Sequence, residues 1–321
     1  MRRLVPMLCL AAFIAAGLST TASAAVKGGI GDQNATTFSD PHFTALKIKR
    51  TRLIVPFDAI FKNPGGVDGW VKAALAAKVE PLIAFNPSQG SHCPAKPCSV
   101  PSVAAYTKAL KAWRKKYPKV KLFNFWNETN SPTQPTGPSR PAVLKKTAAL
   151  YRAALKVCGR KCTVTGPDIL DLAFDQKSGQ KRAKKWVSMF VKYAKKTPAL
   201  WGFHNYGDTN YRKTTGTKFF LKRLVRKGKV WITETGGVVQ FRTSTGKKTP
   251  LSKYDEKRAA KGVAFAYSLA NKFKSRIQRL YYYQWRKNNA GDFFDAGITA
   301  FDGSLRPSYA ELKKLPKSFW K

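Results

Sequence analysis

The sequence predicts a (β/α)8 barrel, also called a TIM barrel, that forms a single domain. Short apolar segments alternate eight times with amphipathic helical patterns along the chain. No low-complexity tract, short repeat or linker interrupts this alternation. Eight strand–helix units in roughly 250–300 residues are typical of the barrel.

The expected elements follow from apolar runs and from capping signals. The expected strands are residues 28–33, 52–57, 80–85, 122–127, 163–166, 201–206, 230–234 and 280–285. The expected helices are residues 40–49, 67–78, 101–117, 140–157, 179–196, 216–227, 254–273 and 307–315. In the first helix Asp40 suits the cap and Pro41 the first turn. An open, doubly wound sheet is the alternative, but the irregular segment GGIGDQN does not form its usual Gly-rich phosphate turn.

The first 24 residues have the features of a secretory signal peptide. Two arginines precede an apolar run, and the small residues Ala22-Ser23-Ala24 end it. We therefore expect a secreted protein, extracellular or associated with the cell wall, whose catalytic domain is residues 25–321. A membrane anchor is the alternative, but the apolar run at residues 4–18 is short for a spanning helix and no later segment is apolar enough.

The chain is strongly basic, with 59 Lys and Arg against 17 Asp and Glu and a net charge of +42. Losing Arg2 and Arg3 with the signal peptide lowers this charge to +40. The basic residues are spread over nearly every expected helix, whereas a nucleic-acid-binding protein tends to collect them on one face. The pattern argues against specific nucleic-acid recognition and favours solubility and attraction to anionic polymers. We expect a monomer.

Four cysteines remain after the signal peptide. An even number in an exported protein predicts two disulfides, most simply Cys93–Cys98 and Cys158–Cys162. A zinc site with four thiolate ligands is the alternative. In a barrel the first pair follows the third strand and the second pair precedes the fifth strand. The two pairs then lie at opposite ends, where one metal ion cannot bind both.

Polar and aromatic side chains gather at the carboxyl ends of the expected strands, where active sites of this fold lie. Two of the five glutamates, Glu128 and Glu234, end the fourth and seventh strands. Two carboxyl groups facing one mouth are what glycoside hydrolysis requires, because one protonates the leaving oxygen and the other attacks or activates water. A cap or a structural ion pair is the alternative for either glutamate alone.

The chain resembles the retaining glycoside hydrolases of clan A, whose catalytic glutamates end strands four and seven of a (β/α)8 barrel. The resemblance extends over essentially the whole mature chain. It rests on Asn127-Glu128 after an aromatic strand and on the segments HNY, ITETGG, TRLIVPFD and ITAFDGSLRPSYAEL. Members of family 39 and family 5 are most similar, and the choice between them stays open because the segment AFNPSQG lacks a histidine found in some clan members.

The resemblance implies roles for individual residues. Glu128 becomes the general acid/base and Glu234 the nucleophile, with their carboxyl groups about 5–5.5 Å apart. Tyr206 is expected to donate a hydrogen bond to Glu234, and Arg52 to place its positive charge beside it. The substrate-binding residues implied are Arg52, Asn127, His204, Tyr206 and Trp285. Asn127 is expected to bind the sugar 2-hydroxyl and Trp285 to form an apolar floor under the cleaved sugar.

The expected reaction needs no cofactor. His42 and His92 have no partner at the spacing of metal ligands, so we expect no metal. Four aspartates near strand ends are expected to brace loops rather than bind sugar: Asp32, Asp58, Asp168 and Asp208. The expected function is hydrolysis of a polysaccharide or oligosaccharide, and anionic glycans are among the candidate substrates. The alternative is a wall-associated barrel that binds glycan without cutting it. A cationic binder of nucleic acid or membrane surfaces is a third, less favoured hypothesis.

Overall fold

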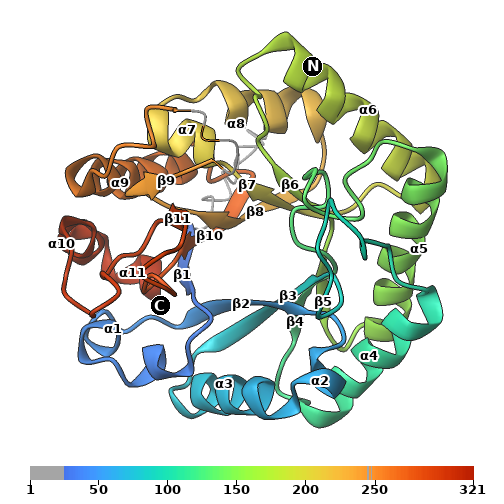
Figure 1. Cartoon of the computed structure of the whole chain (residues 1–321), viewed down its shortest axis with the longest axis horizontal. Helices are drawn as coiled ribbons and strands as arrows, with labels where there is room; N and C mark the ends of the chain where they lie inside the picture. Colours follow the sequence, from blue (N-terminus) through green and yellow to red (C-terminus); the bar gives the residue numbers. More distant parts are fainter. Residues whose placement is uncertain (1–24, 244–245, 247) are drawn as a thin grey trace, which may run out of the picture.

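The structure, a computed structural model, describes residues 25–243, 246 and 248–321. Figure 1 shows helices surrounding a central ring of strands. The predicted signal peptide, residues 1–24, lies outside the described residues and stays a prediction. Within the described ranges, no helix is both long and apolar enough to cross a bilayer.

The central sheet is parallel throughout and closes into a barrel. Its order is β5-β4-β3-β2-β1-β10-β8-β7-β6. Its strands are β1 Lys27–Gly31, β2 Arg50–Pro56, β3 Glu80–Asn86, β4 Leu122–Asn124, β5 Thr163–Thr165, β6 Asp168–Leu170, β7 Leu200–His204, β8 Lys229–Thr235 and β10 Ile277–Tyr283. The outermost strands in this order, β5 and β6, are consecutive pieces of one extended segment. The sheet therefore has eight strand positions, as the sequence predicts.

Two residues between β5 and β6 complete this closure. The amide of Gly166 donates to the carbonyl of Leu200 at 2.7 Å, and the amide of Gly202 donates to the carbonyl of Pro167 at 3.1 Å. The predicted fifth strand thus continues past its expected end, and its second half pairs with β7 while its first half pairs with β4.

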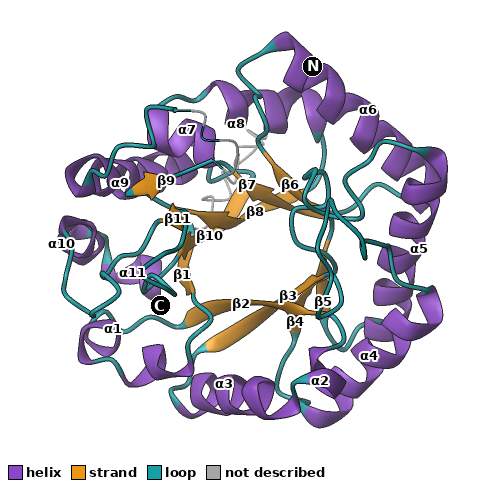
Figure 2. Ribbon diagram, in the orientation of Figure 1, coloured by secondary structure: helices purple, strands orange, loops and turns teal. Residues whose placement is uncertain are grey.

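Helices cover the outside of the barrel, as the ribbon in Figure 2 shows. They are α1 Pro41–Ala45, α2 Ala59–Lys62, α3 Pro64–Ala76, α4 Val103–Lys116, α5 Pro141–Cys158, α6 Lys177–Ala194, α7 Tyr206–Tyr211, α8 Thr215–Phe219, α9 Glu256–Lys272, α10 Pro307–Lys314 and α11 Lys317–Trp320. Each predicted helix is present, the sixth being α8 continued by a π-helical turn at Phe220–Leu224. The helices α2, α7 and α11 and the two-stranded ribbon of β9 (Gln240–Phe241) and β11 (Phe294–Asp295) are additions to the prediction.

The barrel interior is layered. Near the amino ends of the strands, an apolar layer of Leu82, Leu122, Trp231 and Tyr281 fills the space between the strands. A second and larger apolar core separates the sheet from the helices. Because alternate residues of each strand face inward, the next inward positions toward the carboxyl ends lie above the apolar layer. Those positions carry the polar groups described below.

Both predicted disulfides are present. Cys93 bonds to Cys98 in the loop after β3, and Cys158 bonds to Cys162 between α5 and β5. The pairs lie at opposite ends of the barrel strands, so the alternative of one shared zinc site is wrong.

Candidate active site

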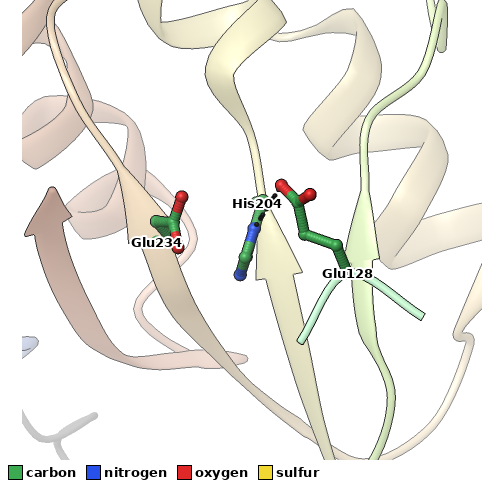
Figure 3. Close-up of side chains that lie close together, drawn as sticks. All are labelled: Glu128, His204 and Glu234. Carbon is green, nitrogen blue, oxygen red and sulfur yellow. Dashed lines mark hydrogen bonds and ion pairs between the residues drawn. The ribbon is translucent and has the colours of Figure 1, made fainter. Parts of the chain in front are cut away.

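The two glutamates singled out in the sequence meet in the barrel mouth. Glu128 follows β4 and Glu234 lies in β8, and each offers a carboxylate oxygen within 4.8 Å of the other and of a ring nitrogen of His204. Figure 3 shows His204 at the end of β7 between the two carboxylates. The separation of the two oxygens is compatible with direct attack by one carboxylate on a sugar bonded between them.

A bulge in β8 directs Glu234 into the mouth. Phe203 of β7 pairs with Ile232, but His204 pairs with Glu234, so β8 has one residue more than β7 at this point. The same residue is extra against β10. Strict alternation would turn Thr233 and Glu234 to opposite faces of the sheet, whereas the bulge lets both contact polar groups of the interior.

Two donors hold the carboxylate of Glu234. The guanidinium of Arg52 donates to Oε2 at 2.6 Å, and the hydroxyl of Tyr206 donates to Oε1 at 3.0 Å. Arg52 is almost fully buried in β2, and the Glu234 side chain is only 9% exposed. Both oxygens of the expected nucleophile are therefore fixed by side chains from the second and sixth strand positions.

Glu128 is held differently from Glu234. Its backbone has a positive φ of 44°, which turns the chain sharply after β4. Its Oε1 lies 3.2 Å from Nδ1 of His204, and its side chain is 20% exposed. Within the described part of the chain, Oε2 has no hydrogen-bond partner. This oxygen is available to a leaving group in the mouth.

His204 carries a positive charge between the carboxylates. Burial alone would lower its pKa, but the negative charges of Glu234 and Asp168 and hydrogen bonds to Asp168 and Glu128 raise the pKa of His204 to about 10. The ring is therefore an imidazolium at neutral pH and donates from both nitrogens. Nδ1 donates to Glu128, and Nε2 donates to Oδ2 of Asp168 at 3.2 Å.

Asp168 binds both cations that contact the glutamates, Arg52 and His204. Its Oδ2 accepts from Arg52 at 2.9 Å as well as from His204, and its side chain is fully buried. Burial would raise its pKa, but the charge and hydrogen bond of His204 and the charge of Arg52 hold the pKa of Asp168 below its usual range. Arg52 and His204, each bonded to one glutamate, thus share one buried counter-ion.

Neutral donors bind the other oxygen of Asp168. Oδ1 accepts from Nδ2 of Asn124 at 2.5 Å and from the hydroxyl of Thr233 at 2.7 Å. The sequence indicated Asp168 only as a loop brace, since a lone aspartate after a strand carries no sign of its partners. Its central place becomes visible only in the closed barrel, where side chains from β4, β6 and β8 meet in the interior.

Asn127 lies beside this network. Its Oδ1 accepts a hydrogen bond from Arg52 at 2.7 Å, and it is 6% exposed. Arg52 therefore contacts Asn127, Asp168 and Glu234 together. Five of the predicted residues, Arg52, Asn127, Glu128, His204 and Glu234, form one connected group with Tyr206 attached to it.

Trp285 lies apart from this group. Its ring is 0% exposed and packs against Phe43 and Tyr309, and its Nε1 donates to Oδ2 of Asp40 at 2.9 Å. A fully buried ring offers no face to a sugar, so the predicted apolar floor does not fit this side chain. Regular β10 ends at Tyr283, so the inward alternation of Tyr281 and Tyr283 does not continue to Trp285, although the amide of Trp285 still donates to the carbonyl of Gly31 in β1 at 3.2 Å.

Tyr283 is the aromatic residue that the sequence interpretation missed. It is half-buried at the end of β10, and burial and the nearby charge of Glu234 raise its pKa. Phe294 of β11 packs against it and against Tyr206, with ring centroids 6.3 and 5.4 Å away. The inward alternation of Tyr281 and Tyr283 was the available signal.

The remaining aspartates brace loops, as expected. Asp32 accepts from the amide of Arg286, and Asp58 accepts from the amide of Gln89 at 3.2 Å. Asp208 accepts from the amides at the start of α8. Each therefore stabilises backbone near the mouth.

The cluster of Glu128, His204 and Glu234 could hold a metal by distance alone. Each of these side chains already has a partner within the protein, because Arg52 pairs with Glu234 at 2.6 Å and the two ring nitrogens of His204 contact the carboxylates of Glu128 and Asp168.

Comparison with known proteins bears on the fold. No family model matches the sequence, and no curated protein sequence matches it. Solved structures do match. A psychrophilic endo-beta-1,4-xylanase of glycoside hydrolase family 10 has a TM-score of 0.62 at 10% identity, covering 91% of this chain and 97% of that chain.

Two further structures agree with this result. Xylanase XynB from Paenibacillus barcinonensis has a TM-score of 0.62 at 10% identity and covers 90% of this chain and 95% of its own. XacCel5A has a TM-score of 0.57 at 14% identity, with coverages of 92% and 98%. The expected resemblance is thereby confirmed for the (β/α)8 fold. At these identities the likeness establishes the fold alone.

Proposed function

We propose that this protein is a secreted retaining glycoside hydrolase that cleaves a polysaccharide or oligosaccharide. The observation that carries the proposal is the pair Glu128 and Glu234, whose carboxylate oxygens approach within 4.8 Å in one mouth. Inverting enzymes keep their carboxyl groups roughly 6.5–9.5 Å apart to admit a water between them. The secretory signal and the two disulfides support export.

The proposed first step is a displacement at the anomeric carbon. An oxygen of Glu234 attacks that carbon, the bond to the leaving oxygen breaks, and Glu128 gives that oxygen its proton. Arg52 and Tyr206 hold Glu234 in position for attack. The product of this step is a covalent glycosyl-enzyme, and the leaving alcohol departs on the side of Glu128.

The proposed second step releases the sugar. Glu128, now ionised, removes a proton from a water molecule, and the water oxygen attacks the anomeric carbon. The bond to Glu234 breaks and the configuration of the substrate is retained. His204 supports both steps because its hydrogen bond to Oε1 of Glu128 leaves Oε2 to exchange the proton.

Hydrolysis is tested first on a panel of polysaccharides. Reducing-sugar release is measured on neutral and acidic glycans, with xylan included because two of the similar structures are xylanases. Glu234→Gln and Glu128→Gln serve as the inactive controls. Release by the wild type that both substitutions abolish supports the proposal, whereas glycan binding without release on any substrate favours the non-catalytic barrel.

Chemical rescue then separates the two roles. Glu128→Ala should lose about 10²–10⁴-fold in rate on the natural glycan, because proton donation is lost. Azide or an aryl glycoside with a good leaving group should restore its activity. Glu234→Ala should not respond to leaving-group quality in this way. Full activity of both alanine variants on the natural glycan would show that the assignment is wrong.

A further inference from the structure

Three adjacent helices on the outside of the barrel contain no acidic residue. They are α4, α5 and α6, which Figure 1 shows side by side along one side of the molecule. Their basic residues are Lys108, Lys111, Arg114, Lys115, Lys116, Lys145, Lys146, Arg152, Lys156, Lys177, Lys181, Arg182, Lys184, Lys185 and Lys192. By contrast, α3 carries Asp68, α9 carries Glu256 and α10 carries Glu311. These three neighbouring helices thus carry fifteen basic residues and no acidic one of their own, and the Asp68 carboxylate of α3 pairs with Lys116 at 3.3 Å.

A groove of about 630 Å³ lies between α4 and α5 within this basic surface. Four cationic side chains border it: Lys111, Arg114, Arg152 and Lys156. Its apolar lining comes from Val103, Ala149, Ala153 and Val157. Val103 is 41% exposed, so its side chain is accessible to a ligand in the groove. The groove thus combines an apolar floor with positively charged walls.

Two of the cations are fixed by the protein and two are free. Arg114 donates to the carbonyl of Val157, and Arg152 donates to the carbonyl of Tyr193. Lys111 and Lys156 are exposed and, among the described residues, form no ion pair. The fixed guanidinium groups shape the groove, and the free ammonium groups can turn toward a ligand.

We propose that this groove, which we call the α4–α5 groove, binds a linear polysaccharide bearing carboxylate groups. A pyranose ring has an apolar face of C–H groups that fits the apolar floor, while its carboxylate reaches the lysines at the walls. Charge complementarity selects the occupant, because four cations border the groove and no carboxylate lines it.

Other anionic partners fit less well. Single-stranded nucleic acid is held by aromatic side chains that stack on the bases, and the groove lining contains none. A membrane surface would contact the protruding lysines of all three helices and leave a recessed floor empty. The groove is built from outer helices, whereas the glutamates lie inside the barrel. Binding here holds the protein on an acidic polymer and leaves the mouth free, whether or not the protein is a hydrolase.

The test is binding of the full-length mature protein to polygalacturonate at low ionic strength. The variant Lys111→Gln/Lys156→Gln removes both free lysines of the groove. The affinity of this variant for polygalacturonate should be at least about fivefold below that of the wild type, because each substitution removes one exposed ion pair with the polymer. The affinity of the wild type should fall with added salt, and methyl-esterified polygalacturonate should bind weakly to both proteins.

A matched variant controls for overall charge. Lys257→Gln/Lys261→Gln removes two exposed lysines from α9, and so changes the net charge by the same amount. Its affinity should change by less than about twofold if the groove is the site. Equal losses in the two variants would overturn the proposal in favour of a general field effect. A groove-dependent affinity for vesicles of anionic lipid, without one for polygalacturonate, would also overturn it. Because the readout is binding, failure of the hydrolase proposal leaves this result unaffected.

Discussion

The carboxylate of Asp168 occupies the space that a side chain on Gly202 would need. A Cβ atom built on Gly202 would overlap Oδ1 of Asp168, with Thr233 also in close contact. The absence of a side chain in β7 is therefore what allows the counter-ion of Arg52 and His204 to sit inside the barrel.

The Gly202→Ala substitution should therefore destabilise the protein and impair catalysis together. The added methyl group displaces a buried, paired carboxylate, and we expect a loss of about 3 kcal/mol or more in the free energy of unfolding. Gly69→Ala is the control, because its Cβ meets open space in α3 and alanine favours a helix by about 1 kcal/mol. Urea unfolding measures the stability of the two variants, and reducing-sugar release measures their activity. An unchanged stability in Gly202→Ala would contradict the packing described here.

The imidazolium of His204 should make stability depend on pH in the alkaline range. Its pKa is raised from 6.5 to about 10 in the folded protein, so the folded state holds a proton that the unfolded state releases. This stabilisation is fully present below pH 6.5 and is lost as the pH rises through 10. The slope from this group reaches at most about 1.4 kcal/mol per pH unit.

Urea unfolding between pH 7 and 9.5 measures this slope. His204→Gln should flatten it, whereas His92→Gln should leave it unchanged, because His92 is exposed and lies directly before the Cys93–Cys98 disulfide. Identical slopes in the wild type and His204→Gln would mean that His204 is neutral in the folded protein.

The hydroxyl of Tyr206 should contribute to catalysis rather than to folding. Tyr206→Phe removes the 3.0 Å hydrogen bond to Glu234, and a bond to a charged group is worth about 1.5–3 kcal/mol. We expect kcat/KM to fall about tenfold to a hundredfold. Tyr117→Phe is a matched control, since its hydroxyl also donates to a carboxylate, Asp68, at 3.0 Å but at the end of α4. Equal kcat/KM values in the two variants would show that the hydroxyl of Tyr206 does not contribute to catalysis.

The two aromatic residues at the end of the eighth strand position should differ in effect. Tyr283→Ala should raise KM with a small change in stability, because its half-buried ring faces the mouth. Trp285→Ala should cost about 3–5 kcal/mol in the free energy of unfolding, because its ring is fully buried. Thermal unfolding and steady-state kinetics separate the two. A raised KM in a stable Trp285→Ala variant would instead support the prediction that Trp285 forms the apolar floor under the sugar.

Alternating apolar and amphipathic segments were sufficient to predict the barrel and its helices, and the even number of cysteines after the expected signal peptide predicted the disulfides. The alternation was sufficient because burying one face of a helix or strand requires a periodic pattern of apolar residues, and a single sequence displays that pattern. The same information placed Glu128 and Glu234 at strand ends, since the carboxyl ends of parallel strands meet. These predictions depend only on the order of elements.

The misjudged residues depend on register instead. Asp168 is central because β6 pairs with β7 after the break at Gly166 and Pro167, and Trp285 is buried because the regular alternation of β10 ends at Tyr283. Neither a break in a strand nor the residue at which a strand ends has a distinct apolar pattern. Such details are decided by hydrogen bonds between strands that are distant in sequence.

The bulge in β8 allows two consecutive side chains to serve one interior. Thr233 anchors Asp168 while Glu234 faces the mouth, which regular alternation forbids. Shortening β8 by Thr233 alone would remove the anchor and leave the carboxylate facing inward. Straightening the strand at full length would instead turn the carboxylate toward the helices. The length of β8 thus decides whether Asp168 keeps its bond to Thr233, and the bulge decides whether Glu234 faces the mouth.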